Sequence, residues 1–192
     1  MLQEKLKDNS IILASGSPRR QHFFESLNID FTIDVRPVNE TYPKTLKREE
    51  ITTYLARLKA EAFTDIADNE IVITSDTIVW KDNKAIEKPQ SHEEATQMLQ
   101  ELSNSMHEVI TSVCFTGKEY QKTIFDVTKV WFKKLSTEEI AHYIKTYKPF
   151  DKAGSYGIQE WIGYIGITKI EGSYFNVMGL PVHKVYAVLI NL

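Results

Sequence analysis

A loop of small polar residues between two apolar segments could bind the phosphates of a nucleotide. Residues 11–14 form a short apolar run that is typical of a buried strand, and residues 15–18 (Ser-Gly-Ser-Pro) interrupt it before a helical pattern over 19–27. Ser17 favours the N-cap of that helix and Pro18 its first turn, so the unpaired N–H groups would face the loop. Such a helix start attracts anions.

Two arginines follow this loop directly. Arg19 and Arg20 carry planar, permanently charged donors that can bind phosphate oxygens in pairs. The alternative is an ordinary strand-to-helix turn with two solvated arginines, because the loop matches neither G-x-G-x-x-G nor the Walker pattern.

An acidic residue in a strongly apolar segment is the second candidate for chemistry. Asp76 lies within the strand-like run 70–80, where an unpaired carboxylate would be costly to bury. We expect it either to meet a cation or hydrogen-bond donors, or to mark the end of the strand at a cleft.

The elements that must position these residues follow from periodicity and from start and stop signals. Apolar spacings of three and four predict a long amphipathic helix over 47–67, and a proline-containing loop over 36–44 holds Glu40. Capping boxes begin helices at Ser91 and Ser136. Further strands are expected at 31–35, 107–115, 123–134 and 161–170, extended chain at 174–178, helices ending at 102 and 146, an irregular polar loop at 148–159 and a C-terminal helix at 182–190.

Composition favours an ordinary globular protein. The 192 residues are 42% hydrophobic and 26% charged with a net charge of -3, which fits one large domain or two small lobes and gives no sign of nucleic-acid binding. No apolar run could span a membrane and the first residues lack a signal-peptide core, so we expect a cytoplasmic location. The single Cys114 excludes an intramolecular disulfide, and the five histidines show no metal-binding spacing.

Four separated motifs together resemble the Maf family of nucleoside triphosphate pyrophosphatases, in order and over essentially the whole chain. The resemblance implies a single domain over 1–192 with an α/β fold, in which a mixed twisted sheet with flanking helices forms two lobes around a central cleft, as in inosine triphosphatases. It also implies hydrolysis of nucleoside triphosphates to the monophosphate and pyrophosphate with a divalent metal, Mg²⁺ or Mn²⁺. The motifs are residues 13–20 (LASGSPRR), 75–77 (SDT) with 88–89 (KP), 151–159 (DKAGSYGIQ) and 170–181 (IEGSYFNVMGLP).

The resemblance also implies roles for individual residues. Thr77 and Gln159 resemble the branch that acts on dTTP and UTP, and with Arg19 they match the positions tied to substrate choice. Asp76 resembles the proton acceptor, and Glu40 is an acidic loop residue that could share a metal ion with it. Polar positions of the cleft are matched by Ser15, Ser17, Arg20, Lys59 and Lys88.

The chain departs from the family pattern at three places. Leu58 replaces an acid between Arg57 and Lys59, Glu160 follows Gln159 where glycine is usual, and Lys148 stands where an acid often does.

Two other functions stay open at this point. One is a nucleotide-binding regulator of septum formation and cell division with little catalysis, and the other is a pyrophosphatase for modified nucleotides. From the resemblance we expect a nucleoside triphosphate as substrate and a homodimer, with no nucleic-acid or membrane partner.

Overall fold

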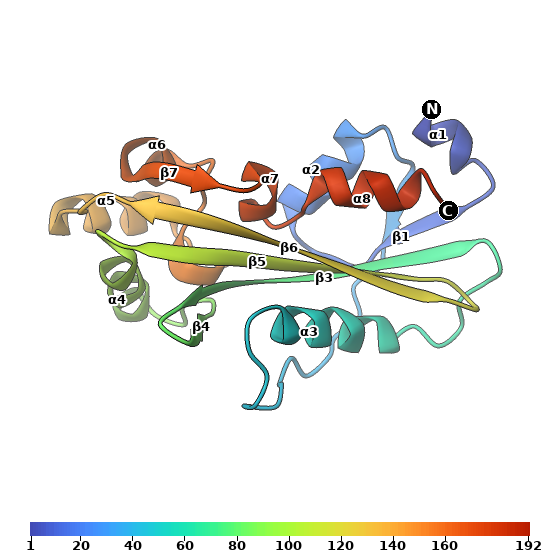
Figure 1. The fold of residues 1–192 in the computed structure, drawn as a ribbon, viewed down its shortest axis with the longest axis horizontal. Helices are drawn as coiled ribbons and strands as arrows, with labels where there is room; N and C mark the ends of the chain where they lie inside the picture. The colour runs from blue at the N-terminus through green and yellow to red at the C-terminus, as the bar shows by residue number, and fades with distance from the viewer. The chain divides into compact units, whose positions relative to one another are not determined.

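The computed structural model describes every residue, Met1–Leu192, and contains both helices and strands along the whole chain (Figure 1). The elements are α1 (Leu2–Lys5), β1 (Ser10–Leu13), α2 (Pro18–Ser26), β2 (Phe31–Ile33), α3 (Glu49–Glu61), β3 (Glu70–Lys81), β4 (Lys84–Ile86), α4 (His92–Leu102), β5 (Met106–Thr116), β6 (Gln121–Phe132), α5 (Thr137–Tyr147), the 3₁₀ turn η1 (Ala153–Ser155), α6 (Trp161–Gly166), β7 (Ile167–Glu171), α7 (Tyr174–Val177) and α8 (Val182–Leu189). None of the helices has the length and apolar content needed to cross a membrane.

The seven strands form one mixed sheet in the order β2-β1-β3-β5-β6-β7, with β4 paired to β3. Strand β1 runs parallel to both β2 and β3, whereas β4 pairs antiparallel with β3 and β7 with β6. The expected α/β class, with a mixed sheet and flanking helices, is therefore confirmed.

The chain divides into two compact units. Unit 1 contains residues 1–76, 111–126 and 179–192, and unit 2 contains 77–110 and 127–178. Strands β3, β5 and β6 contribute residues to both.

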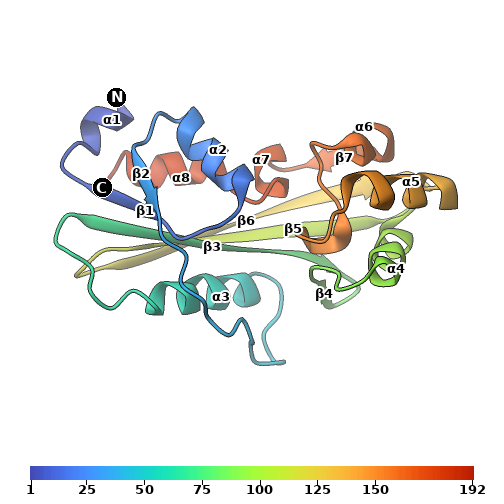
Figure 2. The same cartoon turned by 180° about the vertical axis from the view of Figure 1, so that it is seen from behind.

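In unit 1, α3 covers one face of the sheet while α2 and α8 lie on the other (Figures 1 and 2). The parallel register pairs Leu13 of β1 with Ile73 of β3, and both side chains are buried. Because Ala14 N–H also donates to the Ile73 carbonyl at 2.9 Å, the loop after β1 begins beside the residues that precede Asp76. The carboxyl ends of parallel strands are where ligands gather in α/β proteins.

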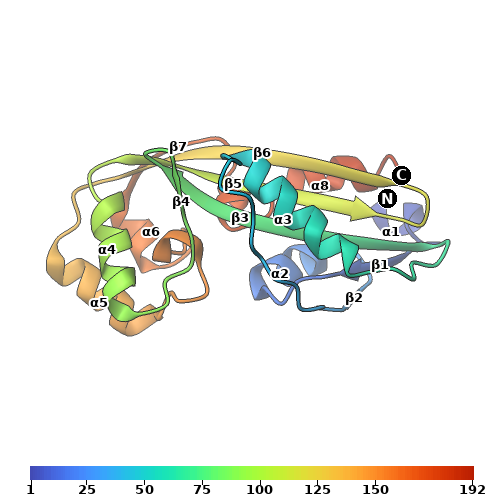
Figure 3. The same cartoon turned by 90° about the horizontal axis from the view of Figure 1, so that it is seen from below.

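In unit 2, α4 lies beside α5 (Figure 3). Helix α4 also packs against η1, and an apolar core lies beneath these elements. The core contains buried side chains from the sheet and from α4, α5 and α6, among them Val79, Leu99, Leu102, Val130, Tyr143, Ile144 and Ile162. Both α4 and α5 begin at the predicted serines, and Ser136 forms a complete capping box with Glu139.

The predicted strand at 161–170 is wrong in its first half, because residues 161–166 form α6 and only 167–171 form β7. The bulky residues of this segment are typical of a strand, but Ile162 and Gly166 are buried four positions apart, which is a helical spacing. Gly163 permits the turn, since a Cβ there would lie 1.8 Å from the Ile158 carbonyl oxygen. The expected extended chain at 174–178 is also a helix, α7, because the Ser173 side chain caps it at Asn176 N–H.

The long helix predicted at 47–67 is shorter at both ends, spanning Glu49–Glu61. Arg36 explains its C-terminal end, because its guanidinium donates to the Ala62 carbonyl at 2.9 Å and lies 4.1 Å from the ring centroid of Phe63. The helix-like apolar spacing beyond this point comes from residues that pack outside the helix. Strand β2 likewise ends at Ile33 rather than 35, and α1 was not expected.

Candidate active site

Asp76 lies inside β3 and is buried, with 8% of its surface exposed. The strand continues for five residues beyond it to Lys81, so the expectation that Asp76 ends the strand is wrong. Its carboxylate instead meets a cation, because Lys59 Nζ lies 2.7 Å from Asp76 Oδ1. The other expectation, a buried acid paired with a cation, is therefore confirmed.

Helix α3 positions Lys59 beside Asp76. Thr74 and Asp76 are two residues apart on β3 and so point to the same face of the strand. On that face Thr74 Oγ1 donates to the Ala56 carbonyl of α3 at 2.6 Å, and Lys59 stands one helical turn after Ala56. The strand period and the helix period thus bring the ammonium group to the carboxylate.

A second carboxylate converges on the same ammonium. Glu40 Oε2 lies 2.9 Å from Lys59 Nζ, so Lys59 bridges the acid of the strand and the acid of the loop. The side chain of Glu40 is 49% exposed, whereas that of Lys59 is 18% exposed. The structure therefore brings these three predicted residues together.

The loop after β1 is organised by Ser15. Its buried hydroxyl accepts from Ser17 N–H at 3.3 Å and from Arg20 Nη1 at 3.3 Å. Ser17 is the N-cap of α2 and Pro18 its first residue, as predicted, but the Ser17 side chain makes no capping hydrogen bond. A Cβ on Gly16 would meet nothing within 4 Å, so the space beside this glycine is open.

Arg20 is tied to the protein rather than solvated. Its Nε donates to the Gly179 carbonyl at 2.9 Å and its Nη1 to the Ser75 carbonyl at 3.2 Å, next to Asp76 in the chain. Burial lowers the pKa of Arg20 to about 10, against the opposing effect of the nearby Asp76 carboxylate, so the guanidinium stays charged at neutral pH. The alternative of two solvated arginines is therefore wrong for Arg20, and the neighbouring Arg19 is half-buried.

The other three predicted residues belong to unit 2. Thr77 is half-buried on β3 and Lys88 is exposed after β4. Gln159 stands in the loop between η1 and α6, and its Oε1 atom is buried without a hydrogen-bond partner. A buried acceptor that lacks a donor is costly, unless a ligand supplies one.

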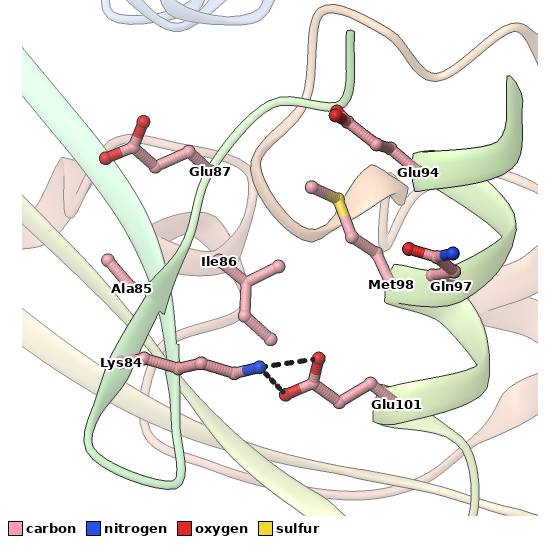
Figure 4. A pocket seen from close by; sticks show the side chains of 8 residues that line it. All are labelled: Lys84, Ala85, Ile86, Glu87, Glu94, Gln97, Met98 and Glu101. Carbon is pink, nitrogen blue, oxygen red and sulfur yellow. Dashed lines mark hydrogen bonds and ion pairs between the residues drawn. The ribbon is translucent and has the colours of Figure 1, made fainter. Parts of the chain in front are cut away.

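A pocket of about 340 Å³ also lies in unit 2, between β4 and α4 (Figure 4). It is lined by Lys84, Ala85, Ile86, Glu87, Glu94, Gln97, Met98 and Glu101. The one lysine pairs with Glu101 at 3.0 Å, so the remaining carboxylates leave the lining negative. Repulsion of like charges disfavours this pocket as a site for a triphosphate.

A divalent metal fits the two acids that converge on Lys59. Mg²⁺ is commonly held by one or two carboxylates together with phosphate oxygens of the substrate. Asp76 and Glu40 both place an oxygen within 3 Å of one point, the Lys59 ammonium.

Sequence reasoning missed several residues that hold the site. The carbonyls of Gly179 and Ser75 receive Arg20, and Tyr143 and Lys152 contact the residue that follows Gln159. Gly179, Ser75 and Lys152 lie inside the motifs quoted above, which was the only signal for them. Nothing in the local pattern distinguishes Tyr143 from an ordinary core tyrosine.

The sequence is similar to known proteins over nearly its whole length. The family model described as Maf-like protein matches residues 10–192. A dTTP/UTP pyrophosphatase of Christiangramia forsetii is 60% identical over 190 residues, which cover 98% of this chain and 97% of the relative. Another, of Flavobacterium psychrophilum, is 58% identical over 192 residues, covering 100% of this chain and 98% of the relative.

Among solved structures, a HAM1 protein from Coxiella burnetii has the same fold. The TM-score is 0.54 with 14% sequence identity, and the match covers 96% of this chain and 100% of that one.

Proposed function

The chain belongs to the Maf-like protein family, and we propose that it hydrolyses dTTP and UTP to the nucleoside monophosphate and pyrophosphate. One observation supports the site of this chemistry above all others. A buried carboxylate, Asp76, and a loop carboxylate, Glu40, share the ammonium of Lys59 beside the loop that Ser15 and Arg20 organise.

The reaction needs a water molecule to attack the α-phosphorus while the bond to the pyrophosphate oxygen breaks. The carboxylate of Asp76 accepts the proton that the attacking water loses. The hydrogen bond from Lys59 positions this carboxylate. Lys59, Arg20 and Lys88 offset the negative charge that develops on the leaving pyrophosphate. Ser15 and Ser17 donate from the loop to phosphate oxygens, and Arg19 adds a further charge there.

Asp76 and Glu40 are the residues that would hold Mg²⁺ or Mn²⁺. When bound, the metal ion supplies charge neutralisation at the phosphates and lowers the pKa of water.

The unpartnered Oε1 of Gln159 supports the choice of base. Thymine and uracil carry an N–H donor at N3 beside the O4 acceptor, and a glutamine amide offers the complementary acceptor and donor. Cytosine carries an acceptor at N3 and a donor at N4, so it would leave the buried Gln159 oxygen opposite another acceptor. Gln159, with Thr77 and Arg19, therefore selects dTTP and UTP, because a mismatched base leaves buried polar groups unpaired.

Further parts of the proposal concern the whole protein. We propose that residues 1–192 act as one Maf-like domain, that the enzyme works in the cytoplasm, and that it forms a homodimer.

The deciding experiment measures pyrophosphate release from dTTP, UTP, CTP, ITP and 7-methyl-GTP, with Mg²⁺, with Mn²⁺ and with a chelator. We expect metal-dependent release that is fastest for dTTP and UTP. Nucleotide binding without release from any of the five would instead favour the regulator of cell division. Strong release from ITP beside weak release from dTTP would favour the enzyme for modified nucleotides.

A further inference from the structure

A network of hydrogen bonds in unit 2 holds the segment that contains Gln159. Tyr143 of α5 is fully buried, and its hydroxyl lies 3.0 Å from the backbone nitrogen of Gly157. The same hydroxyl bonds to Glu160 Oε2, and the other oxygen of Glu160 lies 3.2 Å from Lys152 Nζ. One phenol thus contacts the chain on both sides of Gln159.

The donor and the acceptor of each hydrogen bond made by Tyr143 can be assigned. Burial, with a further contribution from the bond to Glu160, raises the pKa of Tyr143 far above its usual range, so the phenol keeps its proton. The hydroxyl therefore donates to the Glu160 carboxylate and accepts from Gly157 N–H. Lys152, which is 9% exposed, balances the charge of Glu160 inside the protein.

The amide of Gln159 lies beside this network. A Cβ on Gly157 would lie 3.0 Å from Gln159 Nε2 and 2.8 Å from Glu160 Cδ, so both side chains lie over the glycine. The neighbours Tyr156 and Ile158 are buried and hold the backbone in place. The position of the Gln159 amide therefore depends on where Glu160 and Gly157 are held.

We propose that Tyr143 and Glu160 are positioning residues that hold the Gln159 amide with its Oε1 atom presented to the N–H donor of the base. They thereby set the preference for thymine and uracil over cytosine. This inference rests on the proposed function of Gln159.

The test compares Tyr143→Phe with a matched control, Tyr147→Phe, on the same helix. Tyr147 stacks on Tyr143 at 5.1 Å between ring centroids and is 37% exposed. The readout is the ratio of kcat/KM for dTTP to kcat/KM for CTP, which does not depend on the fraction of active protein. We expect Tyr143→Phe to lower this ratio about tenfold, the scale of one misdirected buried hydrogen bond, and Tyr147→Phe to leave it unchanged.

Glu160→Gln provides a second variant, since it keeps an acceptor for the Tyr143 hydroxyl but loses the charge that faces Lys152. We expect a smaller fall, about threefold, because the bond to Tyr143 survives. Amide hydrogen exchange at Gly157 reports on the same network in the absence of substrate. We expect this exchange to be faster in Tyr143→Phe, because the Gly157 N–H loses its acceptor.

Several outcomes would overturn the inference. These are an unchanged dTTP to CTP ratio in both variants, unchanged exchange at Gly157 in Tyr143→Phe, or a wild-type protein that does not discriminate the two nucleotides. If the wild type releases no pyrophosphate at all, the proposed hydrolysis fails, and the ratio of dissociation constants for dTTP and CTP then decides the positioning role.

Discussion

The Asp76 cluster of unit 1 and the Gln159 segment of unit 2 satisfy their polar groups in opposite ways. In unit 1, Asp76 and Glu40 share one ammonium. In unit 2, neutral and paired groups hold the backbone on both sides of Gln159, while its own Oε1 atom is buried without a partner.

The proposed function gives the two regions different roles. Charged groups can bind a metal ion and a triphosphate, and the triphosphate is common to all the candidate substrates. A fixed neutral amide can discriminate between bases, because the wrong base leaves it unpaired. Substitutions in the Asp76 cluster should therefore reduce turnover of all substrates, whereas those near Gln159 should change which substrate is preferred.

The largest effect is expected for Asp76→Asn. Asparagine keeps the shape of the side chain and an oxygen for Lys59, but it can neither accept a proton nor supply a charged metal ligand. We expect turnover of dTTP and UTP to fall by about a thousandfold or more, with an unchanged circular dichroism spectrum. Near-normal pyrophosphate release from this variant would remove Asp76 from the mechanism.

Asp126→Asn is the matched control for this variant. Asp126 lies on β6, its side chain is 14% exposed, and it pairs with Lys184 at 2.7 Å, the same separation as in the Asp76 pair. We expect turnover close to that of the wild type, because this acid lies outside the cluster that includes Glu40.

Gln159→Glu should produce the next largest effect, on substrate choice. A carboxylate offers only acceptors, so it repels the O4 atom of thymine and can accept from the N4 amino group of cytosine. We expect the dTTP to CTP ratio of kcat/KM to fall about a hundredfold. Gln97→Glu on α4, a glutamine of the same unit, is the control and should leave the ratio unchanged. If Gln159→Glu lowered kcat/KM equally for dTTP and CTP, Gln159 would not recognise the base.

Local patterns were enough to predict the parts of both regions that depend on neighbours in sequence. The strand before Ser15, the N-cap at Ser17 and the strand around Asp76 all follow from runs of a few residues. The need of a buried carboxylate for a cation was also predictable, because the cost of burying an isolated charge is general.

Contacts between distant residues were not predictable in the same way. The sequence does not show that Glu40 and Asp76 share Lys59, or that Tyr143 bonds to Glu160 seventeen positions later. In Trp161–Gly166, bulky side chains are typical of a strand, and tertiary packing of one helical face overrides that preference.

His107 gives a pH-dependent test of a neutral group buried in unit 2. Its Nε2 lies 2.7 Å from the Tyr156 hydroxyl, and burial, with the charge of Lys81, lowers its pKa from 6.5 to about 3. Between these values the unfolded chain binds a proton that the folded protein does not, so stability falls as pH falls. We expect the wild type to lose about 2 kcal/mol more than His107→Gln between pH 7 and pH 5 in urea unfolding. The same pH dependence in both proteins would show that His107 becomes charged in the folded state.

The smallest effects should separate two N-cap serines that look alike in sequence. Ser136 caps α5 with its side chain, so Ser136→Ala should cost about 1 kcal/mol of unfolding free energy without changing KM for dTTP. Ser17 caps α2 by position only, with no side-chain bond, so Ser17→Ala should leave stability almost unchanged. It should instead raise KM about threefold, because the hydroxyl that does not serve the helix is the one we assign to the phosphates. A Ser17→Ala protein that loses as much stability as Ser136→Ala, with KM unchanged, would make the loop after β1 an ordinary helix start and would weaken the contrast between the two units.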